Sequence, residues 1–330
     1  MGVGMFKFIF KRLLMMIPVL VGVTFIIFTM LYFTPADAAD MILGDSASIE
    51  QRELLREQLH LNDSFFVQYG RYMKNLITKG DLGTSYTTRL SVTKELLTYF
   101  PNTIKLAVLS SLLAAVFGIT FGIISATKQY SIFDKISTSL ALIGVSMPNF
   151  WLGMMLIIVF AVNLKWVPPS GISTPSGWIL PTITLSCVGL AQLTRMTRSS
   201  MLEVIRQDYI RTARAKGLGN SSIIIKHALK NALIPVTTAV GLTISRLLGG
   251  AVLAESVFSV PGLGKLMVDA IKQRNYPVVQ SGVLLIALSM SVVNLLVDIL
   301  YAFADPRIRS QYVRSRKKKP AMLKGAETSE

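Results

Sequence analysis

The sequence predicts an all-α membrane protein with about six transmembrane helices. Of its 330 residues, 52% are hydrophobic and only 16% are charged, which is more apolar than the composition of an ordinary water-soluble domain. Apolar stretches about 20 residues long recur along the chain, and a helix of that length crosses the hydrocarbon core of a bilayer. Lysine and arginine are concentrated in every second connection between these stretches, as in multi-pass membrane proteins.

The predicted organisation is an N-terminal segment 1–12, a first span 13–36, an external segment 37–101, a transmembrane core 102–304 and a C-terminal tail 305–330. The core contains the other five spans. Residues 311–330 are polar and basic, so we expect them to be disordered. The six apolar stretches are 13–36, 106–127, 136–164, part of 166–194, 231–254 with Arg246 inside it, and 275–297, which Asp298 follows.

The first span has some features of a cleavable signal peptide. Lys7, Lys11 and Arg12 precede it, and Ala36 and Ala38 flank an aspartate after it. The apolar core of a secretory signal is about 7–15 residues long, whereas this stretch exceeds 20 residues. We therefore interpret it as a retained span.

The distribution of charge predicts that both termini are cytoplasmic. The segments 1–12, 127–136, 195–230 and 305–330 hold 21 Lys and Arg and 6 acidic residues, whereas the remaining connections hold 11 of each. Lys and Arg are retained on the cytoplasmic side of membrane proteins. The net charge of +16 is therefore explained by topology and needs no nucleic-acid partner.

Three connections are too long to be simple turns. The external segment 37–101 contains an amphipathic stretch at 48–60, where a surface helix is expected. Ser48 and Gln51 have the spacing of a capping box at its start. The other two long connections are the cytoplasmic loop 197–231 and the external loop 255–281.

The sequence contains no recognisable catalytic or metal-binding motif. Residues 261–265 read Pro-Gly-Leu-Gly-Lys, but Leu266 stands where a phosphate-binding loop needs serine or threonine, and the segment is predicted to be external. His60 and His227 are predicted on opposite sides of the membrane, and Cys187 is the single cysteine, inside an apolar run. We expect no catalytic residue, metal or cofactor in this chain, so ATP would have to be bound by other subunits.

The cytoplasmic loop predicts a short amphipathic helix, a turn and a second helix. Gly217 is suited to end the first helix in a left-handed conformation, and the second should begin near Ser221 or Ser222. Such an element could dock into a groove on a partner or lie on anionic lipid headgroups; composition supports both interpretations equally. The residues expected on its apolar face are Ile205, Tyr209, Thr212 and Ala213, and those around it are Arg206, Arg211 and Arg214.

This loop resembles the coupling-helix motif of the membrane permease subunits of ATP-binding-cassette (ABC) importers. The family motif is Glu-Ala-Ala, three residues, Gly, nine residues, then Ile-x-Leu-Pro. Aligned on Gly217, this chain has Arg211-Thr212-Ala213 at the first triplet and His227-Ala228-Leu229-Lys230 at the closing positions. Despite these departures, the whole of 209–235 is similar to the branch that imports dipeptides, oligopeptides and nickel.

Further segments resemble landmarks of the same branch, in the same order, over nearly the whole chain. The long external segment after the first span is similar to that of the first of the two dissimilar permease subunits in such importers. The landmarks are at 80–85, 101–103, 146–151, 167–171, 255–258, 261–264 and 305–307.

The resemblance implies a type I ABC importer permease fold in a bacterial cell membrane. It implies four kinds of partner: a second homologous permease, two cytoplasmic ATP-binding subunits, an external substrate-binding protein and membrane lipid. It also assigns site residues. The translocation path is assigned to Arg246, Pro148 and Asn149, and contact with the ATPases to Tyr209, Arg211, Thr212, Ala213, Arg214, Gly217 and His227.

Arg246 is the strongest candidate for the path on physical grounds. A charge at membrane depth is costly and usually faces a bundle interior or water. The alternative is a structural contact with a carbonyl group or with an acid of a partner subunit. Asp298 is predicted near the other end of its own span, too far away to pair with Arg246, and Lys105 is expected to extend its ammonium group to the interface.

Two other classes of function remain as alternatives. An ATP-independent channel or secondary transporter would need no docking helix, and a membrane-embedded enzyme would need a set of convergent acids, bases or metal ligands. Lys105, Arg246 and Asp298 are isolated and form no such set. For the cargo, the resemblance implies a di- or oligopeptide in preference to nickel, because the branch consists mostly of peptide importers. The sequence also offers no cluster of metal ligands. Glutathione is a further alternative within the same family.

Overall fold

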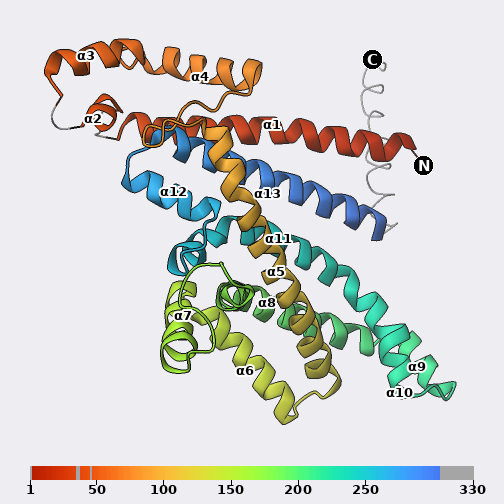
Figure 1. Ribbon diagram of the computed structural model, residues 1–330. Helices are drawn as coiled ribbons and strands as arrows, with labels where there is room; N and C mark the ends of the chain where they lie inside the picture. The colour runs from red at the N-terminus through yellow and green to blue at the C-terminus, as the bar shows by residue number, and fades with distance from the viewer. Residues whose placement is uncertain (1, 35–37, 45–46, 305–330) are drawn as a thin grey trace, which may run out of the picture.

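The computed structural model describes residues 2–34, 38–44 and 47–304, so the end of the predicted first span and the tail 305–330 lie outside the described residues. In the described part the chain is helical, with one isolated β-bridge between Thr84 and Ser91 (Figure 1). The helices before the bundle core are α1 (Gly2–Tyr32), α2 (Ala38–Leu43), α3 (Ile49–Gln58) and α4 (Phe65–Lys79). The others are α5 (Val92–Thr127), α6 (Ile132–Ser146), α7 (Asn149–Leu156), the π-helix η1 (Ile157–Asn163), the 3-10 helix η2 (Pro175–Trp178), α8 (Ile179–Ile205), α9 (Asp208–Ala215), α10 (Asn220–Ser222), the π-helix η3 (Ile223–Leu229), α11 (Lys230–Val257), α12 (Leu263–Lys272) and α13 (Tyr276–Ala304).

The predicted number of spans is confirmed. Five described helical stretches are long and apolar enough to cross a membrane, and α6 with α7 and η1 makes a sixth as a bent pair. The third span, predicted as the single stretch 136–164, is instead broken by 107° near Pro148. Met147 is extended, with ψ of 132°, because the ring of a following proline disfavours the helical conformation.

Two other helices extend beyond the predicted spans. The second helix begins at Val92 and includes Pro101, so the last ten residues of the predicted external segment already belong to α5. The fourth helix, α8, continues to Ile205 and takes in the first part of the predicted loop 197–231. A hydropathy criterion misses these helix ends because charged and polar residues lie near them.

The long helix α5 crosses the bundle and packs along α8, which also contacts α6 and α11 (Figure 1). The crossing is close because α5 places two glycines against α8. A Cβ atom at Gly118 would lie 2.9 Å from the Leu190 carbonyl oxygen, and one at Gly122 would lie 2.5 Å from the Thr197 Cβ. Small residues spaced four apart allow such close approach of membrane helices.

Replacing Gly122 with alanine is expected to destabilise the protein by about 1–3 kcal/mol, because the new methyl group overpacks the contact between α5 and α8. Thermal unfolding of the detergent-solubilised protein, followed by circular dichroism, measures the change. The matched control is Gly22→Ala in α1, where the added Cβ meets nothing within 4 Å. Equal unfolding temperatures for the two variants would contradict the prediction.

The first span and the N-terminal segment that follows it form an aromatic cluster. Figure 1 shows α1 beside α13 and α4 beside α1. Phe28 of α1 makes an edge contact with Phe65 of α4 at 5.4 Å between ring centroids, and the hydroxyl groups of Thr24 and Tyr69 lie 3.1 Å apart. Aromatic edge contacts of this kind stabilise packing beyond the buried area alone.

Of the two surface helices in this segment, the sequence predicted one. The capping box at the start of α3 is confirmed: the Ser48 Oγ accepts from the Gln51 amide at 3.2 Å, and the Gln51 side chain accepts from the Ser48 amide at 3.0 Å. The second helix, α4, was not predicted, although its sequence is amphipathic. The polar residues within it interrupt the apolar pattern at several positions.

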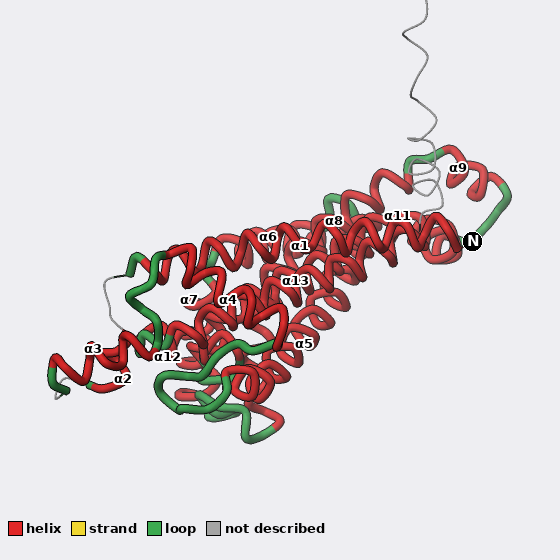
Figure 2. The backbone as a smooth tube through the Cα atoms, turned by 90° about the horizontal axis from the view of Figure 1, so that it is seen from above, coloured by secondary structure: helices red, strands yellow, loops and turns green. Residues whose placement is uncertain are grey.

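The bundle has two distinct ends. Figure 2 shows α9 and the N-terminus at one end, and α2, α3 and α12 at the other. We call these the α9 end and the α12 end. Each end carries its own cluster of buried polar contacts.

Candidate functional site

The helix α9 is held to the bundle by a small apolar face. Ile210 is fully buried and Ala213 is 7% exposed, and both pack in a cluster that contains Ala126 of α5, Met201 of α8 and Ile223 of η3. The helix α9 is therefore packed against α5, α8 and η3.

The predicted apolar face was right for Ile205 and Ala213, which pack in this cluster, and wrong for Tyr209 and Thr212. Ile205 is the last residue of α8, and the chain turns at Gln207, which is extended with ψ of 151°, before α9 starts. The spacing counted from Ile205 therefore does not continue through the turn. Tyr209 is 42% exposed, and its hydroxyl accepts a hydrogen bond from the Asn231 side chain at 2.9 Å. Thr212 is exposed as well.

The predicted end of the helix is confirmed. Gly217 has φ of +76°, a left-handed conformation that glycine adopts without steric cost. Its amide donates to the Arg214 carbonyl at 2.9 Å, and the Leu218 amide donates to the Ala213 carbonyl at 3.3 Å. These bonds satisfy carbonyl groups at the end of α9.

The residues assigned to ATPase contact divide into two groups. Tyr209, Arg211, Thr212 and Arg214 lie on α9 with exposed side chains, whereas Ala213 faces the bundle. His227 is not on α9: it is half-buried in the π-helix η3, which leads into α11. The surface that α9 offers to a partner is consequently basic, and Arg211 makes only an exposed ion pair of 3.6 Å with Asp208.

A buried ion pair lies near the α9 end and was not predicted. The carboxylate of Asp134, at the start of α6, accepts from Arg198 of α8 through Nε at 2.8 Å and through Nη2 at 2.9 Å. It also accepts from the Ser125 hydroxyl and from the Tyr130 amide. The Asp134 side chain is only 6% exposed. These contacts hold the turn between α5 and α6 against α8. The pair was not predicted because the sequence analysis counted Asp134 and Arg198 only as charges of two separate loops.

The candidate path residues do not form one cluster. Arg246 lies on an exposed part of α11, and its Nη1 donates to the Gln192 side chain of α8 at 3.0 Å. Pro148 and Asn149 lie at the break between α6 and α7. Among the described residues, no hydrogen bond joins Arg246 to either of them.

The other two charges in the spans have partners of their own. Asp298 of α13 pairs with Arg12 of α1 at 3.1 Å, which agrees with the expectation that it does not pair with Arg246. The ammonium group of Lys105 lies 4.3 Å from the centre of the Trp178 ring. A cation over an aromatic face is stabilised by the ring quadrupole.

At the α12 end, a fully buried glutamate organises three of the predicted landmarks. The Glu255 carboxylate accepts from the Thr103 hydroxyl at 2.6 Å and from the Lys265 amide at 3.0 Å, and the Gly264 amide also donates to it. The Thr103 oxygen in turn accepts from the Leu263 amide at 2.8 Å. The cluster satisfies the first amide groups of α12, and negative charge is stabilised at a helix N-terminus.

A fourth landmark, the segment 80–85, packs at the same end of the bundle. Asn275, which is 3% exposed, donates to the Ser85 hydroxyl at 2.8 Å and accepts from the Tyr86 amide at 3.0 Å. The segment 80–85 is thereby held against the start of α13. The resemblance had marked all four of these segments, but their common role as packing contacts required the structure.

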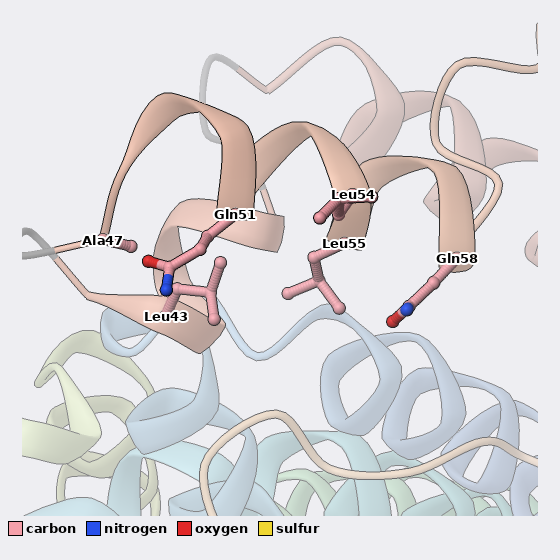
Figure 3. Close-up of a pocket in the computed structure, with 6 residues that line it drawn as sticks. All are labelled: Leu43, Ala47, Gln51, Leu54, Leu55 and Gln58. Atoms are coloured by element: carbon pink, nitrogen blue, oxygen red, sulfur yellow. The ribbon is translucent and has the colours of Figure 1, made fainter.

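Two cavities lie in the described part of the chain, and Arg198 of the buried ion pair lines the larger one. A cavity of about 390 Å³ lies at the α12 end, between α2 and α3 (Figure 3). It is lined by Leu43, Ala47, Gln51, Leu54, Leu55 and Gln58. A larger cavity of about 700 Å³ lies between α6 and α8 and is lined by Thr138, Thr194, Arg195, Arg198, Ser199, Leu202, Glu203, Arg206 and Gln207. Within the described residues, no group of three or more His, Cys, Asp and Glu side chains is placed to hold a metal ion.

Comparison with known families covers both halves of the chain. Residues 118–310 match the family described as binding-protein-dependent transport system inner membrane component, and residues 5–107 match the N-terminal domain of such membrane components. The first match alone covers more than half of the chain.

Three curated relatives align along almost their entire length. The dipeptide transport system permease protein DppB of Alkalihalophilus pseudofirmus is 46% identical over 92% of this chain and 100% of its own. The di/tripeptide transport system permease protein DppB of Pseudomonas aeruginosa is 44% identical, with coverage of 93% and 100%. The glutathione transport system permease protein GsiC of Escherichia coli is 41% identical, with coverage of 92% and 99%.

Solved structures support the fold. An inward-facing structure of the MetNI methionine ABC transporter aligns with a TM-score of 0.56 and 20% identity over 64% of this chain and 97% of the other. An amino acid ABC transporter with histidines aligns with a TM-score of 0.51 and 14% identity over 65% and 94%. The fold is thus that of a type I importer permease, and the chain belongs to the inner membrane components of binding-protein-dependent ABC transport systems.

Proposed function

We propose that this chain is the first of two permease subunits of an ATP-driven importer of di- or oligopeptides and forms half of its translocation path. Full-length similarity to two permeases named for dipeptide or di/tripeptide transport supports peptide as the cargo. The observation that carries the proposal is α9, a short basic helix anchored by Ile210 and Ala213 to the ends of two spans.

In the proposed orientation the α9 end faces the cytoplasm of a bacterial cell and both termini lie on that side. The bias of Lys and Arg toward 1–12, 127–136 and 195–230 supports this orientation. So does the position of the N-terminus at the same end of the bundle as α9 (Figure 2). The α12 end would then face the external substrate-binding protein.

In this proposal, two partner subunits bind and hydrolyse ATP. Their movement would reach this chain through the exposed side of α9, around Tyr209, Arg211 and Arg214. The apolar cluster beneath α9 would pass it to α5, α8 and, through η3, to α11. A second permease would complete the path, which on this side is lined by Arg246, with Pro148 and Asn149 at the hinge-like break of the third span.

A glutathione importer permease is a second candidate, supported by the 41% identical relative. Nickel import remains a candidate only through the family resemblance. An ATP-independent channel is the alternative from another class, and it would move its cargo without any ATPase subunit.

The test is to purify the tagged chain from its native membrane in mild detergent and to identify the subunits that come with it. We compare the wild type with Gly217→Val, because a β-branched residue is strained at φ of +76°. The expected result is that a second permease and ATPase subunits co-purify with the wild type, and that the valine variant loses the ATPases.

Gly217→Asn is the matched control, because asparagine tolerates the left-handed conformation and no atom lies within 4 Å of a Cβ atom at this position. This variant should keep the ATPase subunits. A wild-type chain that purifies without partners and still transports cargo in proteoliposomes would overturn the proposal in favour of a channel.

A further inference from the structure

One face of α8, continued by Arg206 directly after it, carries a row of polar and charged side chains toward the α9 end. Gln192, Arg195, Ser199, Glu203 and Arg206 follow one another at intervals of three or four residues, which places them on the same side of a helix. Gln192 is half-buried and the other four are exposed. We call these five residues, together with Arg246, the α8 stripe.

The stripe lies between two neighbouring helices. On one side, Arg246 of α11 donates to Gln192 at 3.0 Å. On the other, Thr138 of α6 and the stripe residues Arg195, Ser199 and Arg206 line the cavity of about 700 Å³. The stripe therefore borders open volume along the half of α8 nearest α9.

Two of its arginines are available to a ligand. Arg198, which also lines the cavity, is occupied by the buried carboxylate of Asp134. Arg195 and Arg206 have no ion-pair or hydrogen-bond partner among the residues that the structure describes. Guanidinium groups are suited to bind carboxylates through two parallel hydrogen bonds.

The net charge of the stripe is positive. Arg195, Arg206 and Arg246 contribute three positive charges and Glu203 one negative charge, which gives +2. Arg246 lies inside an apolar stretch, where a charged side chain faces a bundle interior or a water-filled cavity. Arg195, Glu203 and Arg206 lie in the segment whose charge indicates the cytoplasmic side. The large cavity beside Arg195 and Arg206 favours water.

We infer that the α8 stripe is a carboxylate-attracting surface of the translocation path, which favours anionic, carboxylate-bearing cargo over cationic cargo. The inference rests on the proposed function and specifies the chemistry of the cargo that this half of the path attracts. A cleft lined by one sign of charge raises the local concentration of the opposite charge. A divalent metal cation would be repelled by the same surface, so the stripe favours peptides over nickel.

The test uses the complete importer, with its second permease, ATPases and binding protein, reconstituted in proteoliposomes. Uptake of alanyl-glutamate and alanyl-glutamine, which differ by one carboxylate charge, is measured at saturating concentrations of preloaded binding protein. The double variant Arg195→Glu/Arg206→Glu changes the charge of the stripe from +2 to −2. We expect the ratio of alanyl-glutamate to alanyl-glutamine uptake to fall about tenfold, which a general folding defect would not produce.

The matched control is Lys135→Glu, which reverses an exposed positive charge on α6 outside the cavity lining and should leave the ratio unchanged. An unchanged ratio in the double variant, with transport intact, would overturn the inference and leave the proposed function standing. Loss of the second permease from the double variant would also overturn it, because the arginines would then be pairing with a partner subunit. Absence of ATP-driven uptake by the wild-type assembly would instead contradict the proposed function.

Discussion

Replacing Asp134 with alanine is expected to lower the free energy of unfolding by about 3–5 kcal/mol. The substitution leaves the Arg198 guanidinium without the carboxylate that binds it through two hydrogen bonds. It also removes the acceptor of the Ser125 hydroxyl and the Tyr130 amide. A partly buried charge without a partner costs more than the pair itself contributes.

Denaturant or thermal unfolding of the purified protein measures the loss, and two further variants make the result specific. The double variant Asp134→Leu/Arg198→Met removes both charges and should recover most of the stability, because an apolar pair of similar volume can replace a buried ion pair. Asp208→Ala breaks an ion pair whose carboxylate is 96% exposed and should have little effect. If the double variant is as unstable as Asp134→Ala, the unpaired charge of Arg198 is not the cause of the instability.

The same cluster shows what the sequence could and could not predict. Local signals were sufficient for the number of spans, for the capping box at Ser48 and for the left-handed turn at Gly217, because each depends on residues that are near one another in the chain. The pair of Asp134 and Arg198 joins residues 64 positions apart, and no periodicity reports such a contact.

Local reasoning failed where a backbone feature interrupts a helix. The 107° bend lies inside an unbroken apolar stretch, so hydropathy alone gave one span, although Pro148 was visible as a breaker. The turn at Gln207 likewise shifted the apolar face of α9 from Tyr209 to Ile210. In both places the pattern was correct over a few residues and wrong when extended through a break.

The surroundings of the candidate path residues depend on long-range geometry even more strongly. The sequence selected Arg246 because a charge in a span is costly, but it missed that Gln192 on another helix holds this arginine. It also treated Arg195 only as part of a cytoplasmic charge count and assigned Arg206 to the predicted loop helix, whereas helical spacing places both on one face with Gln192. The spacing can be read from the sequence. It was not used because the sequence did not show that α8 continues to Ile205.

Glu255 has the second large expected effect, because it is a fully buried carboxylate with several donors. Glu255→Ala leaves the Thr103 hydroxyl and the Lys265 and Gly264 amides without their acceptor. Each buried donor that loses its partner costs about 1–3 kcal/mol, so we expect a loss of about 3 kcal/mol or more, with α12 detaching first.

Hydrogen exchange locates this loss. The amides of Leu263, Gly264 and Lys265 should exchange slowly in the wild type and much faster in Glu255→Ala, while those in the middle of α11 change little. Ser256→Ala on the same helix is the matched control, because its hydroxyl bonds only to the Val252 carbonyl of its own helix. Gly262→Ala is an independent test, because a Cβ atom at this position would overlap the Glu255 carboxylate. This variant should speed exchange at the same three amides while it keeps the glutamate. If exchange at these amides is unchanged in both Glu255→Ala and Gly262→Ala, the glutamate does not hold α12 in place.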